Sequence, residues 1–308
     1  MTGQPPEVVS VHDLRKTYGD VKAVDGITFS VIKGEIFGIV GPNGAGKTTT
    51  MDCIVGMKKS DSGSLSVLGL DPIKQGLKLR QRLGIQQQES ELPDRIRVRE
   101  TMELFSSFYS RTLEWREILD HLSLLDKSEA YFSDLSGGQK RKLFVALALV
   151  GDPEIVFLDE LTSGLDPQAR RIIWELVTRL RDEGRTIFLS THYMDEAEKL
   201  CDRVAIIDKG RIIALDTPDR LITSLGFGIR VVFTASGEFS EETLNGISGM
   251  LSVERDENRI TCMIRDSSVV LEIVKKLISL DTTLDDFRTE RTTLEDVFLS
   301  VTGKEVRN

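Results

Sequence analysis

Residues 41–49 read Gly41-Pro42-Asn43-Gly44-Ala45-Gly46-Lys47-Thr48-Thr49. An apolar run at 35–40 precedes this stretch, and a helical pattern begins at about residue 47. This order of strand, glycine-rich loop and helix is typical of a phosphate-binding loop. Its glycines let backbone N–H groups turn toward phosphate oxygens, and the helix N-terminus adds a partial positive charge. We therefore expect residues 41–49 to bind a nucleotide, with Lys47 at the β- and γ-phosphates and the Thr48 hydroxyl on Mg²⁺.

A second motif supplies acids at the end of an apolar strand. Residues 155–160 read IVFLDE and end in Asp159 and Glu160. Open α/β sheets bind ligands at this end of their strands. Adjacent strand residues point to opposite faces, so we expect the strand end to splay and direct both acids toward the phosphate loop. Asp159 would then hold Mg²⁺ and Glu160 would orient or deprotonate the attacking water. The phosphate loop alone leaves kinases, GTPases, helicases and transport ATPases open.

The net charge and the hydrophobic pattern of the chain argue against several other classes of protein. The chain has 308 residues and a formal net charge of -9, which argues against nucleic-acid binding because phosphate contacts need clustered Lys and Arg. We interpret the basic run 140–142 as a solvated helix face. The apolar run 143–150 is far shorter than the roughly 20 residues of a membrane span, and the first residues lack a secretory pattern. We expect a cytoplasmic chain whose three cysteines are buried and free.

The hydrophobic patterns predict two domains. The first, 8–224, is expected to be an α/β domain with an antiparallel β subdomain and a helical subdomain at about 90–150. Its predicted strands are 8–14, 27–32, 35–40, 64–68, 155–158, 187–189 and 204–207, and its predicted helices are 98–109, 113–122, 139–150, 168–182 and 194–200. The second, 225–308, is expected to be a small α+β domain with strands 229–234, 251–254 and 259–264 and a helix 269–280.

A third motif, Leu135-Ser136-Gly137-Gly138-Gln139, opens the predicted helix 139–150. Together with GPNGAGKTT before it and FLDE after it, it resembles the signature of the ATP-binding-cassette (ABC) ATPases, a family of P-loop NTPases. The resemblance implies that two chains bind ATP head to tail, with Ser136 and Gly138 of one chain facing the γ-phosphate held by the other. A helix N-terminus is a suitable anion site for that role.

Further positions match the family one by one. Tyr18 stands where the family has an aromatic residue stacked on adenine. Gln88 matches a glutamine that contacts Mg²⁺ or water, although the run of glutamines at 86–88 lets this assignment slip by one. Asp166 lies in the loop that crosses to the partner chain, and His192 matches the histidine that contacts the γ-phosphate. Leu161 replaces the usual proline after the acid pair, with little effect expected on the chemistry.

The stretches 84–100 and 292–303 resemble a narrower group, the ATP-binding subunits of daunorubicin-resistance-type drug exporters. The resemblance implies an ATPase that forms a homodimer through an ATP sandwich. It also implies separate multi-span permease chains, a place on the cytoplasmic face of the membrane, and export of drug-like or antibiotic compounds. The charged and apolar residues of 88–100 are expected to dock on the permease.

Two alternatives stay open, a DNA-repair ATPase and a translation ATPase of the same family. The short spacer between Lys47 and Ser136 leaves no room for the long coiled coil of the first. The single phosphate loop and single signature differ from the paired cassettes usual in the second.

Overall fold

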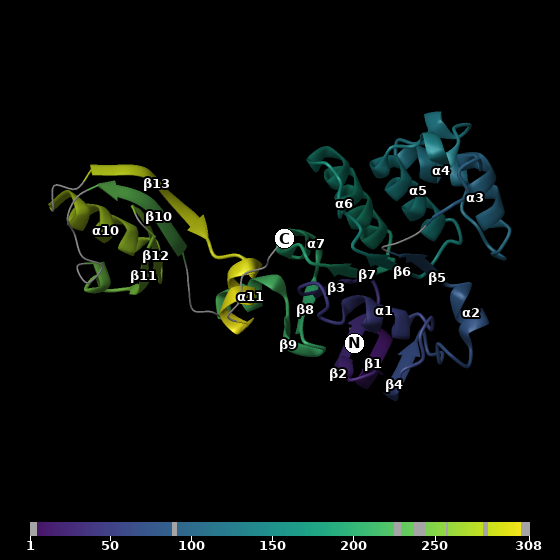
Figure 1. Cartoon of the computed structure of the whole chain (residues 1–308), viewed down its shortest axis with the longest axis horizontal. Helices are drawn as coiled ribbons and strands as arrows, with labels where there is room; N and C mark the ends of the chain where they lie inside the picture. The colour runs from purple at the N-terminus through teal and green to yellow at the C-terminus, as the bar shows by residue number, and fades with distance from the viewer. Residues whose placement is uncertain are drawn as a thin grey trace. The chain divides into compact units, whose positions relative to one another are not determined.

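The computed structural model describes residues 5–87, 91–224, 229–236, 244–256, 258–279 and 283–302. These residues divide into two compact units, one ending at Thr217 and the other beginning at Pro218. Figure 1 shows the helices and strands of both units. The expected α/β architecture is confirmed in the first unit, which contains two sheets and a group of helices.

A six-stranded sheet forms the centre of the first unit. Its strands, in spatial order, are β5 (Leu83–Gln86), β6 (Ile155–Asp159), β7 (Thr186–Thr191), β3 (Ile36–Val40), β8 (Arg203–Asp208) and β9 (Arg211–Asp216). All neighbouring pairs are parallel except β8 and β9. Every residue of β3, β6 and β7 is buried, as expected for strands covered on both faces. The flanking helices are α1 (Lys47–Ile54), α6 (Pro167–Asp182) and α7 (Met194–Leu200).

An antiparallel sheet packs on this centre through aromatic side chains. Its strands, in spatial order, are β2 (Val21–Ile32), β1 (Glu7–Tyr18) and β4 (Ser62–Val67). Phe29 of β2 stacks on Phe37 of β3 with ring centroids 5.0 Å apart. Phe37 in turn contacts Phe188 of β7, and Phe188 contacts Phe157 of β6. One apolar core therefore joins the two sheets.

The helical part of the first unit follows the predicted pattern, with α3 and α4 shorter than expected and α5 beginning two residues earlier. It contains α3 (Val98–Ser106), α4 (Trp115–His121) and α5 (Gly137–Leu149), preceded in the chain by α2 (Gly76–Arg80). Two 3₁₀ turns, Leu125–Lys127 and Phe132–Asp134, lie between α4 and α5. Helix α5 packs on α3, α4 and β5, and so connects the helical part to the edge of the central sheet.

The second unit is an antiparallel sheet with helices. Its strands, in spatial order, are β11 (Met250–Asp256), β12 (Arg259–Ile264), β10 (Ile229–Ser236) and β13 (Thr283–Arg291). Helix α10 (Ser268–Ser279) buries Val269, Ile273 and Leu277 in the core that these strands form. The remaining helices are α8 (Pro218–Ser224) and α11 (Leu294–Thr302).

The boundary between the units differs from the expected one. Residue 225, the predicted start of the second domain, lies outside the described residues. Helix α8 belongs to the second unit because it packs against α11. The boundary therefore lies between Thr217 and Pro218, seven residues before the predicted start of the second domain.

We predict that α8 stabilises the second unit. It buries Leu221, which is 7% exposed, and burial of one leucine contributes about 2 kcal/mol. A fragment of residues 218–308 should therefore unfold at a higher temperature than one of residues 225–308, as measured by circular dichroism. Leu221→Ala in the longer fragment should remove most of the difference. Equal midpoints for the two fragments would contradict the boundary.

Candidate nucleotide-binding site

The phosphate loop joins the fully buried strand β3 to helix α1. Gly46 is the N-cap of α1 with a φ of 106°, and no described side chain caps that helix. The first backbone N–H groups of α1 are thus left for an anion, and the helix dipole favours negative charge there.

Two glycines of the loop lie against backbone carbonyls. A Cβ at Gly41 would stand 2.2 Å from the carbonyl oxygen of Ile207, and one at Gly46 would stand 2.2 Å from that of Ala23. Gly44 has a φ of 79° but no atom within 4 Å of the same position. Glycine is therefore required by close packing at 41 and 46, and only by backbone conformation at 44.

Lys47 is buried at the centre of the loop. Its ammonium donates to the carbonyl oxygens of Gly41 at 2.8 Å and Pro42 at 3.1 Å, and lies 3.7 Å from Oε1 of Glu160. Burial lowers the pKa of Lys47, whereas the carboxylates of Glu160 and Asp159 oppose this effect. The side chain is held by its own loop, so little reorganisation is needed to present a cation to a phosphate.

The two acids at the end of β6 reach the same site. Burial raises the pKa of Asp159, and hydrogen bonds donated by the Ser190 and Thr48 hydroxyls oppose this effect. Glu160 follows with a φ of 46°, a left-handed conformation that costs a non-glycine residue about 1–2 kcal/mol. Its N–H donates to the carbonyl of Ser190 at 2.9 Å. This turn breaks the strand alternation and brings the Glu160 carboxylate beside Lys47.

His192 follows strand β7 and contacts the second acid. Its Nδ1 is 3.2 Å from Oε1 of Glu160, although the two atoms do not form a hydrogen bond. The Tyr193 ring packs on the imidazole with centroids 4.1 Å apart. Phosphate loop, acid pair and histidine thus lie at one edge of the sheet, because β6, β7 and β3 are parallel neighbours.

Tyr18 stands at the open side of this site and is 44% exposed. The ammonium groups of Lys16 and Lys58 each lie 5.6 Å from its ring centroid. A cavity of about 410 Å³ is lined by Tyr18, Ala23, Asn43, Gly44, Gly46, Lys47, Thr48, Thr49 and Glu160. The predicted adenine-stacking residue therefore shares one cavity with six of the nine residues predicted to bind the phosphates, whereas Gly41, Pro42 and Ala45 do not line it.

The signature residues lie away from that cavity. Ser136 caps α5, where its Oγ accepts from the N–H of Gln139 at 3.3 Å and its own N–H donates to Oε1 of Gln139. Ser136 and Gly137 are exposed. Neither they nor Gly138 line the cavity around Lys47. A single chain does not bring the signature and the phosphate loop together.

Asp166 is likewise separate from the cavity around Lys47. It is the N-cap of α6, and its carboxylate accepts from the N–H groups of Gln168 and Ala169, both at 2.9 Å. Gln88 lies outside the described residues, so its predicted contact with Mg²⁺ or water stays a prediction.

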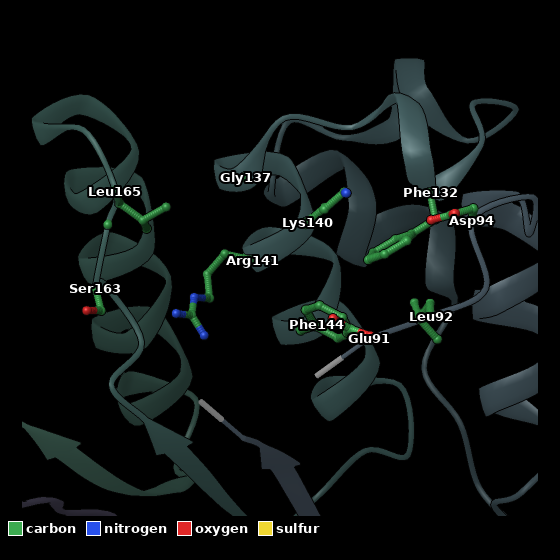
Figure 2. A pocket seen from close by; sticks show the side chains of 11 residues that line it. Glu91, Leu92, Asp94, Phe132, Gly137, Lys140, Arg141, Phe144, Ser163 and Leu165 are labelled. Carbon is green, nitrogen blue, oxygen red and sulfur yellow. The ribbon is translucent and has the colours of Figure 1, made fainter. Parts of the chain in front are cut away.

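A second cavity of about 480 Å³ separates α5 from the loop that precedes α6 (Figure 2). Figure 2 shows Arg141 extending from α5 into the space beside Ser163 and Leu165. Burial lowers the pKa of Arg141, and the carboxylates of Glu160 and Asp159 oppose this effect. The prediction of a solvated basic face at 140–142 was wrong, because all three residues are half-buried. Lys140 and Arg141 line this cavity, and the Lys140 ammonium lies 4.6 Å from the centroid of the Phe132 ring.

The expected docking segment is partly packed on its own unit. Arg97 donates to the carbonyl oxygen of Glu129, and its guanidinium lies 4.7 Å from the Tyr131 ring. Val98 is fully buried, whereas Arg95 is exposed. Arg97 and Val98 therefore help to fix the start of α3, whereas Arg95 is exposed to solvent.

Comparison with known proteins shows which family the chain belongs to. A family model described as ABC transporter matches residues 24–163. The Nod factor export ATP-binding protein I of Ralstonia nicotianae is 37% identical, and the alignment covers 98% of this chain and 95% of that protein. The chain belongs to the ABC transporter family.

Similarity to two further proteins supports membership of this family. A daunorubicin resistance ATP-binding protein of Streptomyces coeruleorubidus is 34% identical over 97% of each chain. The solved structure of an ATP-binding subunit of an ABC transporter is 27% identical with a TM-score of 0.66, and the match covers 71% of this chain and 93% of that one. The cassette is thus an ATP-binding and ATP-hydrolysing subunit. The DNA-repair and translation alternatives find no support in these relatives.

Ser190, which donates a hydrogen bond to Asp159, was not predicted from the sequence. The available signal was a hydroxyl residue directly after the apolar run 187–189, two positions before His192. Among the helices within the described ranges, none is long and apolar enough to cross a bilayer.

We predict different effects for two alanine substitutions in the phosphate loop. Gly46→Ala should destabilise the first unit by about 3 kcal/mol or more, because a new Cβ meets a backbone carbonyl in a left-handed residue. Gly44→Ala should cost only about 1 kcal/mol, because space is free there and the cost is conformational. Both tryptophans, Trp115 and Trp174, lie in the first unit, so tryptophan fluorescence during denaturation reports its unfolding. Equal losses for the two variants would contradict the packing described at Gly46.

Proposed function

We propose that this chain powers an exporter, using ATP-dependent closure of a homodimer on the cytoplasmic face of the membrane. Full-length similarity to the Nod factor export protein carries this proposal, because the match extends over the second unit as well as the cassette. The full-length similarity to the daunorubicin resistance protein supports a drug-like or antibiotic compound as cargo. Separate multi-span permease chains would hold the cargo path.

The ATP-binding roles follow from the cavity around Lys47. Tyr18 stacks on adenine at the open side, and the N–H groups of residues 43–49 surround the phosphates at the start of α1. Lys47 supplies the positive charge for the β- and γ-phosphates. Burial strengthens this attraction, since a charge pair shielded from water interacts more strongly than an exposed one.

The side-chain oxygen atoms of Thr48 and Asp159 also suit Mg²⁺ as ligands. The Thr48 hydroxyl donates to the Asp159 carboxylate, so two oxygen ligands already lie side by side. Mg²⁺ typically takes one or two protein oxygens and completes its shell with phosphate and water. When bound, it would neutralise charge on the transferred phosphoryl group. Thr48 and Asp159 would hold it, and Gln88 is assigned to it by resemblance.

Glu160 is the proposed general base. Its buried carboxylate would take a proton from the attacking water, at Oε1 or Oε2. His192, 3.2 Å from Oε1, would keep that carboxylate oriented and contact the γ-phosphate. The left-handed backbone at Glu160 supports a functional assignment, because strained conformations persist mainly where the surroundings enforce them.

A second copy of the chain would complete each site. The exposed N-terminus of α5 has no acidic residue in its first turn and is suited to a phosphate. Ser136 and Gly138 of one copy would face the γ-phosphate bound by the other, with Asp166 in the loop between them. The separation of signature and phosphate loop within one chain supports this arrangement. We assign no nucleic-acid partner.

We predict that Glu160→Gln keeps ATP binding but lowers turnover by about 10²–10⁴, the usual contribution of a general base. Glutamine preserves shape and hydrogen bonding, whereas it cannot take the proton. The variant should also accumulate as an ATP-bound dimer in size-exclusion chromatography.

The matched control is Glu154→Gln. Glu154 immediately precedes strand β6, at the opposite end from Glu160, and pairs with Arg82 at 2.9 Å. This variant should turn over ATP like the wild type. Wild-type turnover by Glu160→Gln would remove Glu160 from the mechanism.

A further inference from the structure

Helix α7 begins close to the candidate site, at Met194, two residues after His192. Helix α6, whose N-cap is Asp166, packs against α7. A change in the position of α7 relative to α6 would therefore change the position of His192. The inference below rests on the proposed role of His192 in ATP hydrolysis.

A part-buried hydrogen bond joins these helices. Nε1 of Trp174, in the second turn of α6, donates to Oε1 of Glu196 at 3.0 Å. Glu196 lies in the first turn of α7 and is 0% exposed. Its other oxygen, Oε2, is buried and has no hydrogen-bond partner within the part of the chain that the structure describes. A buried carboxylate with one free oxygen is costly, and such groups call for an explanation beyond packing.

The other contacts between the two helices are weaker. Arg170 of α6 pairs with Asp195 of α7 at 3.3 Å, but the Asp195 side chain is 62% exposed. Water and salt screen such a pair. The Arg170 guanidinium also lies 4.7 Å from the Tyr193 ring, which packs on His192. The bond between Trp174 and Glu196 is part-buried and ends on a fully buried carboxylate, so among the polar contacts described here between the two helices it should hold its geometry best.

We propose that Trp174 and Glu196 are positioning residues that hold His192 against Glu160. Glu196 is four residues from His192, so a shift of the first turn of α7 moves the imidazole with it. The imidazole is only 3.2 Å from the Glu160 carboxylate, and a small displacement breaks that contact. ATP binding should be spared, because neither residue lines the cavity around Lys47.

A purely structural role would give a different result. Loss of the bond would then lower stability, and turnover would fall only as far as the folded fraction falls. The positioning role lowers kcat in fully folded protein while KM for ATP stays unchanged. It also requires that a variant retaining the bond retains kcat.

The test compares three variants of the full chain at a temperature where all are folded. Trp174→Phe keeps an aromatic ring under Lys199 and removes the N–H donor. Glu196→Gln keeps an acceptor oxygen for Trp174. Ile173→Val is the matched control, because it opens space at a fully buried position of α6 without touching the bond. Steady-state ATPase assays give kcat and KM, and thermal unfolding gives stability.

We expect Trp174→Phe to lower kcat about tenfold with KM for ATP within about twofold, since misplacing a catalytic group by less than 1 Å has effects of this size. Glu196→Gln should keep at least about half of the wild-type kcat, because the bond survives. Ile173→Val should lower the melting temperature and leave kcat unchanged. Equal kcat for Trp174→Phe and Ile173→Val at full folding would overturn the proposal, as would a tenfold loss in Glu196→Gln.

His192→Ala separates this inference from the proposed function. A large loss of turnover in His192→Ala, with none in Trp174→Phe, overturns the positioning role and leaves the proposed function intact. Wild-type turnover in His192→Ala would instead remove His192 from hydrolysis and contradict the proposed mechanism itself.

Discussion

The close contact of the phosphate loop with two backbone carbonyls is the constraint on which the rest of the first unit depends. Gly41 lies against Ile207 of β8, and Gly46 lies against Ala23 of β2. The loop is therefore held between the central sheet and the antiparallel sheet. Hydrogen bonds from Gly210 to Ala45 and from Asp25 to Gly210 reinforce this arrangement. A loop held in this way presents its N–H groups in a fixed geometry, so little conformational entropy is lost when phosphates bind.

Strand order places the remaining chemistry beside that loop. Strand β7 lies between β6 and β3, so the acids after β6 and the histidine after β7 end next to the phosphate loop. The left-handed residue Glu160 then turns its carboxylate toward Lys47, against the alternation of the strand. The signature at the start of α5 is absent from this cluster, and its Ser136 and Gly137 are exposed. In the proposed dimer, one chain builds half of an ATP site, and the N–H groups at the start of α5 donate hydrogen bonds to a phosphate held by the second chain.

Motifs with strict spacing could be predicted from the sequence, because their chemistry fixes both residue type and order. The strands and helices around the phosphate loop, the acid pair and His192 lie close to where the sequence predicted them, whereas the roles assigned to these residues stay predictions. Strands β9 and β13 were missed because they mix charged and apolar residues without clear alternation, and their pairing partners decide their conformation. The unit boundary was misplaced because contact between α8 and α11 is a tertiary property. The burial of Arg141 could not be predicted from the residues next to it, since the loop that it faces lies more than twenty residues away in sequence. The bond between Trp174 and Glu196 also joins distant segments.

We propose that each ATP-hydrolysing site combines the phosphate loop of one chain with the signature of another. The most direct measurement is the ATPase activity of a mixture of Lys47→Ala and Ser136→Arg chains, each of which should be inactive alone. A mixed dimer contains one site with both lesions and one site with neither. We predict that mixing restores activity in proportion to the fraction of mixed dimers. A mixture no more active than the sum of its separate components would contradict the account.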